Sequence, residues 1–412
     1  MPLPALKVPA PGNRVKYKQI YTEIVLTPRE RLMATLRGGK VDRPPVSFYE
    51  IGGFNINPDD PDEYNVYKSP SWRPLLELAW NHTDIIRLAS PVRKDSHSSW
   101  SNQDTNPEGF EQLRKLEIWE EDNNRLSRLS YKAGQKSLTS LTRRSKDLDT
   151  VWTLEPLLKN TEDAKTFLKL PDEIFEESID MAPLFQQEKE IGDNGIVMVD
   201  TEDPICAVAS LFDIGDFALF AFSEPELCHK LLEKHSRYIY KRTETTAREF
   251  PGRLWRIYGP EYATEPFLPP DLFNEYVVRY DKPMIEMIHR TGGYARVHIH
   301  GRIKGILDHV AGMGADAIDP IEPPPQGDVE LEYLRQKYGA DLVLFGNLEI
   351  SDIENMPSDQ FRDLVKSSIE AGTRGQGRGF VLMPSGAPYG RDIQELTLRN
   401  YEIIIEEINK LT

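Results

Sequence analysis

Short runs of apolar residues recur along most of this sequence, and most are followed by a longer stretch with the apolar spacing of a helix. Most runs lack alternation between apolar and polar residues, which is typical of parallel strands buried on both faces. Eight such strands are expected, at residues 45–49, 85–89, 196–199, 254–258, 295–299, 315–318, 342–345 and 380–383. This repeated order of strand and helix predicts an α/β protein with a single (β/α)8 barrel, the TIM barrel.

The helical stretches carry local signals that place their ends. Thr27 is a predicted N-cap, with Pro28 at the first helical position and Glu30 completing a capping box. The expected helices cover residues 27–37, 225–249, 270–290, 303–313, 329–338, 357–371 and 393–411.

One region interrupts this order after the second predicted strand. Residues 109–153 contain three strand-like segments, at 116–120, 125–131 and 137–142, separated by the turn signals DNN and AGQK. We expect an antiparallel β-rich insertion here, placed over the barrel mouth. The domain prediction is therefore an N-terminal arm at 1–26, rich in Pro and Lys, followed by one barrel at 27–412 that carries the insertion.

Charge and composition exclude several classes of function. The chain has 412 residues and a net charge of -16, so its overall field repels a phosphate backbone and nucleic acid is not an expected partner. No apolar stretch has the length of a membrane helix, and the first residues lack the apolar core of a secretory signal, so a soluble, cytoplasmic protein is expected. Cys206 and Cys228 are too few for a disulfide framework or an all-cysteine metal site.

Polar residues gather where the predicted strands end. In barrels of this kind the loops at those ends converge on one mouth, which is where the chemistry takes place. The rim includes Glu50, Glu202, Asp203, Glu261, His298, His300, Asp319, Glu322, Asn347 and Ser385. The aromatic residues Tyr49, Tyr258 and Tyr389 lie near the same rim, and lining a substrate pocket explains them about as well as ordinary packing does.

The sharpest local feature is the sequence VHIHG at residues 297–301. His298 and His300 stand two positions apart on a strand, so their rings face the same side, and Gly301 leaves room for a ligand to approach. Two imidazoles, one carboxylate and an open position make a catalytic zinc site, and Glu261 is the best placed carboxylate. Binding of a substrate carboxylate and a purely structural role are the alternatives for the histidine pair.

A succession of motifs resembles the uroporphyrinogen decarboxylase superfamily, which also contains the methylcobamide-dependent methyltransferases. The resemblance extends from about residue 27 to the C-terminus, apart from the insertion, and implies the same single barrel. The motifs are TPRERLMATLRGGKVDRPPV, DPICAVASLFDIGDFALFAFSEPELCHKLL, GPEYATEPFLPPDLFNEYVVRYDKPMIEMIH, HIHGRIKGILDHVAGMGADAIDPIEP, YGADLVLFGNLEI and RGFVLMPSGAP.

The resemblance is closer to the methyltransferase branch. True uroporphyrinogen decarboxylases carry an arginine-rich stretch that holds the substrate carboxylates, and the matching stretch here, SFYEIGGFN, has no arginine. The methyltransferase branch holds zinc with a His-x-Cys pair and a second Cys after the last strand. His298 matches the first ligand, His300 replaces the first Cys, and Ser385 stands near the position of the second.

This resemblance implies a zinc-dependent methyltransferase of the demethylase type. The methyl group would move between a small methylated substrate, for example a methoxylated aromatic, and a corrinoid (methylcobamide) carried by a partner protein. Glu261 would be the third metal ligand, Ser385 or Asn347 a substrate contact, and Glu202 or Glu322 an acid. The alternatives are a metal-free decarboxylase of a small carboxylated substrate and a catalytically inactive ligand-binding barrel. Outer helices of such barrels often pair, so a homodimer is expected.

Overall fold

The computed structural model describes residues 25–94, 110, 112–176 and 178–411. Most of the predicted N-terminal arm, at 1–26, and the first residues of the predicted insertion lie outside these ranges. Among the described residues, no helix combines the length and apolar character needed to span a bilayer.

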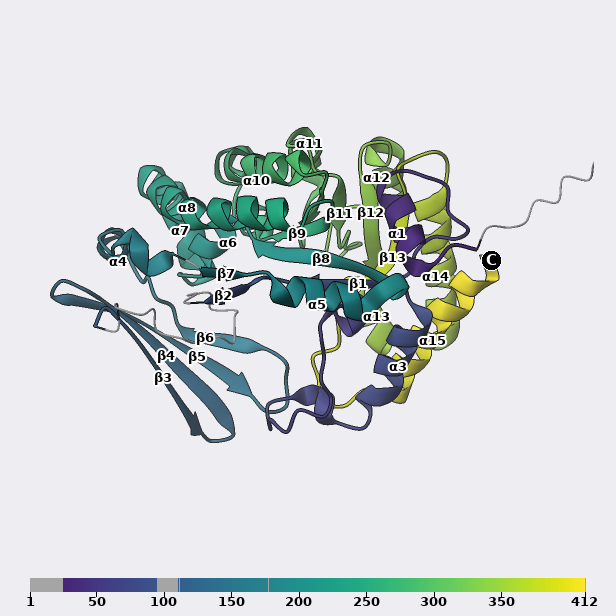
Figure 1. Ribbon diagram of the computed structural model, residues 1–412, viewed down its shortest axis with the longest axis horizontal. Helices are drawn as coiled ribbons and strands as arrows, with labels where there is room; N and C mark the ends of the chain where they lie inside the picture. The colour runs from purple at the N-terminus through teal and green to yellow at the C-terminus, as the bar shows by residue number, and fades with distance from the viewer. Residues whose placement is uncertain (1–24, 95–109, 111, 177, 412) are drawn as a thin grey trace, which may run out of the picture.

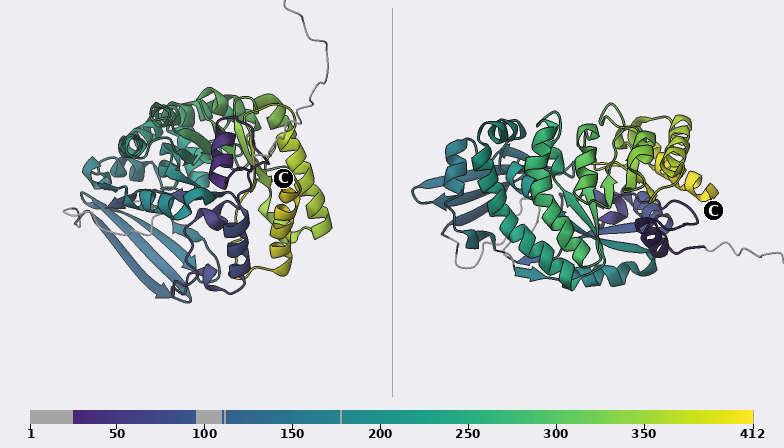
Figure 2. Two further views of the ribbon diagram at one scale, coloured as in Figure 1. Left: turned by 45° about the vertical axis from the view of Figure 1, so that its right-hand side comes forward. Right: turned by 90° about the horizontal axis from the view of Figure 1, so that it is seen from above.

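The centre of the molecule is a curved, parallel, seven-stranded sheet in the described residues (Figures 1 and 2). Its order, β1-β8-β9-β10-β11-β12-β13, follows the chain, as the repeated order of strand and helix predicts. The strands are β1 (Ile85–Ala89), β8 (Gly195–Glu202), β9 (Leu254–Tyr258), β10 (Tyr294–His298), β11 (Ala317–Asp319), β12 (Val343–Leu348) and β13 (Phe380–Pro384).

The segment predicted as the first of eight strands, at 45–49, forms only a single parallel bridge, between Val46 and Leu382 of β13. The Val46 carbonyl accepts a hydrogen bond from the amide of Asp84, next to β1, at 2.7 Å. The Asp84 carboxylate in turn accepts the Val46 amide at 2.9 Å and pairs with Arg31 and Arg43. Ladder pairing stops at Val46 because Tyr49 takes a positive φ of 55° and begins a short helix.

The helices surround the sheet, most of them on its outer side, while the first helix packs against its inward-facing residues through Leu32 and Leu36. Their bounds are α1 (Pro28–Leu36), α2 (Glu50–Gly53), α3 (Trp72–His82), α4 (Thr161–Phe167), α5 (Ala182–Ile191), α6 (Pro204–Ala209), α7 (Ile214–Ser223), α8 (Pro225–Glu249), α9 (Pro270–Phe273), α10 (Arg279–Arg290), α11 (Leu307–Gly312), α12 (Leu331–Tyr338), α13 (Ile350–Asn355), α14 (Ser358–Thr373) and α15 (Glu395–Ile408). The capping box predicted at Thr27 and Glu30 is confirmed. The helix predicted at 270–290 is divided into α9, a π-helical turn (Asn274–Val278) and α10.

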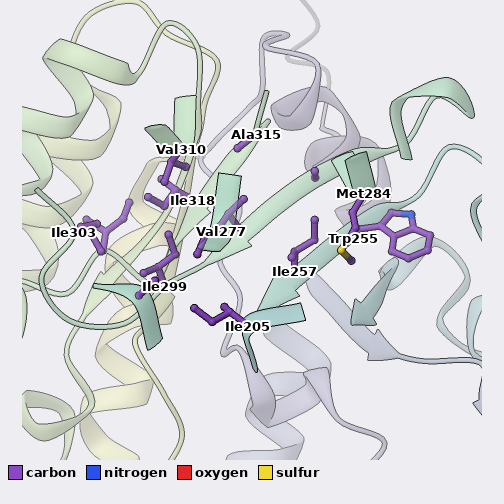
Figure 3. Packing of buried hydrophobic residues seen from close by; sticks show 14 of the residues in the cluster. Ile205, Trp255, Ile257, Val277, Met284, Ile299, Ile303, Val310, Ala315 and Ile318 are labelled. Carbon is purple, nitrogen blue, oxygen red and sulfur yellow. The ribbon is translucent and has the colours of Figure 1, made fainter. Parts of the chain in front are cut away.

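Alternate side chains of the strands enter two separate cores. Trp255, Ile257 and Ile318 face outward and pack with helix residues such as Met284 of α10 (Figure 3). The inward-facing residues form a smaller cluster inside the curved sheet, which includes Met198, Leu254, Phe345 and Met383. The strands therefore bury both faces, which is why their sequences show no simple alternation of apolar and polar residues.

The predicted insertion forms a separate antiparallel sheet with four strands in the described residues. They are β3 (Arg114–Glu121), β4 (Asn124–Ala133), β5 (Lys136–Ser145) and β6 (Val151–Glu155), and the last of them was not predicted. Two further short strands, β2 (Val92–Lys94) and β7 (Ser178–Asp180), pair with each other. The four-stranded sheet lies beside the parallel sheet, at the lower left of Figure 1.

Candidate functional site

The inward-facing residues become polar toward the carboxyl ends of the strands. The register pairs Asp200 of β8 with Arg256 of β9, and Arg256 with Arg296 of β10. Two residues further along, the same register pairs Tyr258 with His298, and His298 with Asp319. The pleat brings every second residue to the same face, so one charged layer lies directly beneath another.

His298 is buried between an acid and an aromatic ring. Its Nδ1 lies 2.8 Å from Asp319 Oδ2, and its ring stacks on Tyr49 with the centroids 5.9 Å apart. Burial lowers the pKa of His298 to about 4, although Asp319 opposes the shift. Burial alone would raise the pKa of Asp319, but Arg296 and His298 outweigh it and hold the pKa below its usual range. His298 is therefore neutral, and its Nδ1–H donates to the Asp319 carboxylate, which leaves Nε2 as an acceptor.

His300 has the same type of partner. Its Nδ1 lies 2.7 Å from Glu322 Oε1, while Glu322 Oε2 accepts the amide of Gly301 at 2.6 Å. Burial disfavours a charge on the ring, but the hydrogen bond and charge of Glu322 outweigh it and raise the pKa of His300. The ring centroids of His298 and His300 are 4.6 Å apart and the planes are nearly perpendicular, at 89°. The two rings are thus adjacent, as predicted, and each has a carboxylate on Nδ1.

Glu261 lies in the turn that follows β9, in a 3-10 helix (Pro260–Ala263). Burial raises the pKa of Glu261, and its Oε2 accepts the amide of Gly259 at 3.2 Å. In the part of the chain that the structure describes, no three His, Cys, Asp or Glu side chains are arranged to hold a metal ion. The imidazole pair fits a metal, because its carboxylates fix the tautomer that zinc ligands adopt. Glu261 as third ligand stays a prediction.

The turn after β9 also depends on Gly259, whose φ is +123°. A Cβ at this position would lie 2.3 Å from Asp203 Oδ1 and 2.3 Å from Cys206 Cβ. Asp203 caps α6 through the Cys206 amide at 2.7 Å, and its carboxyl group neighbours that of Asp281, whose two oxygens have no hydrogen-bond partner in the described structure. Burial, together with the neighbouring carboxyl group, raises the pKa of Asp203 well above its usual value, and burial does the same for Asp281.

Two buried arginines lie in the charged layer beneath the histidines. Arg256 forms a two-point contact with Asp200, at 2.6 and 3.0 Å, and also donates to the Tyr49 hydroxyl. Arg296 pairs with Asp319 at 2.9 Å, and its Nη2 has no hydrogen-bond partner in the described structure. Sequence analysis missed both arginines, although a charged residue inside a buried strand is a signal for a paired charge.

Two predicted residues, Glu202 and Tyr258, meet where β8 and β9 end. Glu202, proposed as an acid, forms an ion pair with Arg242 at 2.9 Å. The hydroxyl of Tyr258 donates to the second oxygen of Glu202 at 3.4 Å. Glu322, the other proposed acid, is held by His300 and Gly301, and His300 outweighs burial to lower the pKa of Glu322. Neither role as an acid is tested by these contacts.

The remaining predicted site residues differ in their burial and in their hydrogen bonds. Asn347 Oδ1 is buried without a hydrogen-bond partner in the described residues, which suits a substrate contact. Ser385 is buried, and its hydroxyl accepts the Ile350 amide at 3.0 Å. Burial raises the pKa of Glu50 in α2. Tyr389 is 54% exposed, and its carbonyl accepts the amide of Asp149 beyond β5.

Comparisons with known proteins bear on the fold and the family. A methyltransferase from Methanosarcina mazei has a similar structure, with a TM-score of 0.54 and 13% sequence identity over 93% of this chain and 99% of that one. D-psicose 3-epimerase aligns with a TM-score of 0.34 and 11% identity, over 60% of this chain and 85% of that one. No curated protein matches the sequence. The family pattern of uroporphyrinogen decarboxylase (URO-D) matches residues 155–395, more than half of the sequence, and the chain belongs to that family.

Proposed function

We propose that this chain is a metal-dependent methyltransferase of the URO-D family. The observation that carries the proposal is the pair of adjacent imidazoles, His298 and His300, each held by a carboxylate on Nδ1. Carboxylates in this position orient metal-binding histidines and make them better ligands. The similarity in structure to a methyltransferase supports the same assignment.

His298 and His300 would hold the metal, with Glu261 as the expected third ligand, and zinc is the metal that this donor set favours. Zinc, when bound, would supply a Lewis acid that polarises an oxygen of the substrate. The chain itself supplies orientation: Asp319 and Glu322 fix both rings, and the free Oδ1 of Asn347 can accept a hydrogen bond from the substrate. We propose that a corrinoid on a separate partner protein exchanges the methyl group.

Metal content tests the proposal most directly. Elemental analysis of protein purified without a histidine tag should give about one zinc per chain. The His300→Ala variant should lose the metal. His289→Ala is the matched control, because His289 pairs with Asp316 at 2.7 Å in a histidine–carboxylate contact outside the site. A wild-type protein without metal after growth in zinc, or equal metal content in all three proteins, would contradict the proposal.

The second step is a transfer assay. Metal-loaded protein should methylate added cob(I)alamin when methyl aryl ethers are offered, and the change in the corrinoid spectrum measures the rate. His300→Ala should lower this rate by about a thousandfold or more, because the ligand that fixes the metal is lost.

A metal-free decarboxylase is the second candidate, and one observation favours it. Arg296 Nη2 is buried without a hydrogen-bond partner in the described structure, two residues before His298 on β10, and could bind a substrate carboxylate. In that case His300, whose pKa is raised by Glu322 against the effect of burial, would donate the proton to the product. Release of CO2 that continues in chelator would favour this reaction over methyl transfer.

A further inference from the structure

A cavity of about 340 Å³ lies between the antiparallel sheet and the barrel, outside the histidine centre. Strands β4, β5 and β6 form one wall, and residues of α4, α6 and α8 form much of the other. The cavity lining includes Glu202, the last residue of β8, and Tyr262, in the turn after β9 at the barrel mouth. A volume of this size exceeds an ordinary packing defect and matches a binding site for a small molecule.

Aromatic rings form part of the cavity wall. Tyr131, Phe167, Phe175 and Tyr238 all line it, and Phe175 and Tyr238 stack with their centroids 6.2 Å apart. The ring of His235 stacks on Phe167 at 5.7 Å, with the planes only 4° apart. Such walls favour a flat, apolar guest.

One buried polar atom of a residue in this wall lacks a hydrogen-bond partner in the described structure. His235 Nδ1 lies 2.5 Å from the hydroxyl of Tyr238, while His235 Nε2 is buried and has no hydrogen-bond partner in the described structure. A buried polar atom without a partner costs about 1–3 kcal/mol, so a bound molecule that reaches Nε2 when the side chains covering it shift would remove that cost. Burial lowers the pKa of His235 to about 3, so the ring is neutral and gives no ion pair to an anion.

The charge of Glu202, where the cavity meets the barrel mouth, also favours one class of ligand over another. Glu202 lines the cavity and is paired with Arg242 at 2.9 Å, so a bound carboxylate would meet an acid whose partner cation is already engaged. An uncharged molecule avoids this repulsion. We propose that the cavity binds a small, uncharged aromatic alcohol or ether, with its oxygen on His235 Nε2 and its ring between Phe167 and the sheet.

The assignment of this molecule as the substrate rests on the proposed function, since Glu202 and Tyr262 join the cavity to the same rim as Glu261. The binding itself does not depend on a metal. Phenol and toluene are suitable probes because they have nearly the same size and differ in one hydroxyl group. Titration calorimetry of the full chain should show phenol binding about tenfold or more tightly than toluene.

Two variants test the location. His235→Phe keeps the ring and removes the nitrogens, so the preference for phenol over toluene should disappear. Ser140→Trp fills the cavity from β5 and should abolish binding of both probes. Ser137→Trp is the matched control, because Ser137 is an exposed residue of the same strand outside the cavity lining, and its binding should equal that of the wild type. Near-ultraviolet circular dichroism checks that each variant is folded.

Equal affinity of the wild type for the two probes would overturn the inference, and so would a folded His235→Phe that still prefers phenol. His300→Ala separates this inference from the proposed function, and phenol should bind to it as to the wild type. Phenol binding by a wild-type protein that holds no metal and transfers no methyl would overturn only the proposed function. A zinc-loaded, active protein that does not bind phenol would overturn only the cavity assignment.

Discussion

The histidine centre and the cavity lie at the same end of the barrel, yet they are built in opposite ways. At the centre, both imidazoles, the carboxylates and two arginines are joined by hydrogen bonds or ion pairs at 2.6–3.0 Å. In the cavity, aromatic rings enclose empty volume around a histidine with one unpaired nitrogen. The comparison indicates that the barrel fixes reactive groups, while the inserted sheet provides space for the body of a ligand.

The largest expected effect is on stability, and it compares the loss of a carboxylate that pairs with a buried charge with the loss of one in an exposed ion pair. Asp319→Asn removes the partner of both His298 and the fully buried Arg296, so the free energy of unfolding should fall by about 3–5 kcal/mol. Asp59→Asn, in an ion pair with Arg73 whose side chains are 76% and 50% exposed, should cost less than about 1 kcal/mol. Urea unfolding followed by circular dichroism measures both. Similar losses would mean that the centre is not the rigid part of the molecule.

The next effect concerns metal affinity at the centre. Glu322→Gln keeps the shape of the side chain but removes the charge that fixes His300, and zinc affinity should fall about 10–100-fold. Glu330→Gln, an exposed residue, serves as the control and should leave the affinity unchanged. Competition with a chromophoric chelator measures both values. Unchanged affinity in Glu322→Gln would show that His300 is oriented without this carboxylate.

The third prediction tests whether burial keeps the carboxyl groups of Asp203 and Asp281 protonated in the folded protein. The raised pKa values of Asp203 and Asp281 mean that the folded protein retains protons that the unfolded chain releases above about pH 4. Stability should therefore fall as pH rises, by up to about 1.4 kcal/mol per pH unit for each proton. Asp281→Asn should flatten this slope between pH 5 and 7 in urea unfolding. An unchanged slope would contradict the assignment of protonated carboxyl groups.

The smallest effect is expected in the cavity. His235→Phe loses the contact with Tyr238 but also removes the unpaired Nε2, so the two changes nearly cancel and stability should shift by less than about 1 kcal/mol. Thermal unfolding is sufficient to measure it. His298→Phe, which leaves Asp319 without its histidine at the centre, should cost more. If the His235 variant were the less stable of the two, the contrast between the regions would fail.

The sequence predicted the strands well where a mainly apolar run of strand length was the only local signal. The runs at 85–89 and 254–258 match β1 and β9, because each is a mainly apolar run of strand length, which is typical of a strand buried on both faces. The helix at 225–249 matches α8, with Pro225 in its first turn. The segment at 45–49 failed as a strand because the positive φ of Tyr49 ends the pairing, and no residue type signals that conformation there.

The candidate site was predicted only in part. The rings at 298 and 300 are adjacent, as the period of a strand predicts, although β10 ends at His298 and His300 lies two residues beyond it. Pairing of His300 with Glu322 joins two loops 22 residues apart and depends on backbone positions that no local pattern encodes. The cavity was not predicted at all. It requires β5 and α8 to stand at a particular separation, and that separation is set by the packing of the whole insertion.

The single bridge at Val46 has a consequence for motion in this barrel. Elsewhere in the parallel sheet neighbouring strands share ladders of two to five residue pairs, whereas here the sheet closes through Val46 alone and its hydrogen bonds with Asp84. Local opening should therefore begin at this seam, and the amides of Ser47 and Leu382 should exchange with deuterium sooner than those of β9 and β10. Such an opening would loosen Tyr49 beside His298 while the rest of the sheet stays folded, and so offers an entry route that leaves the histidine pair in place.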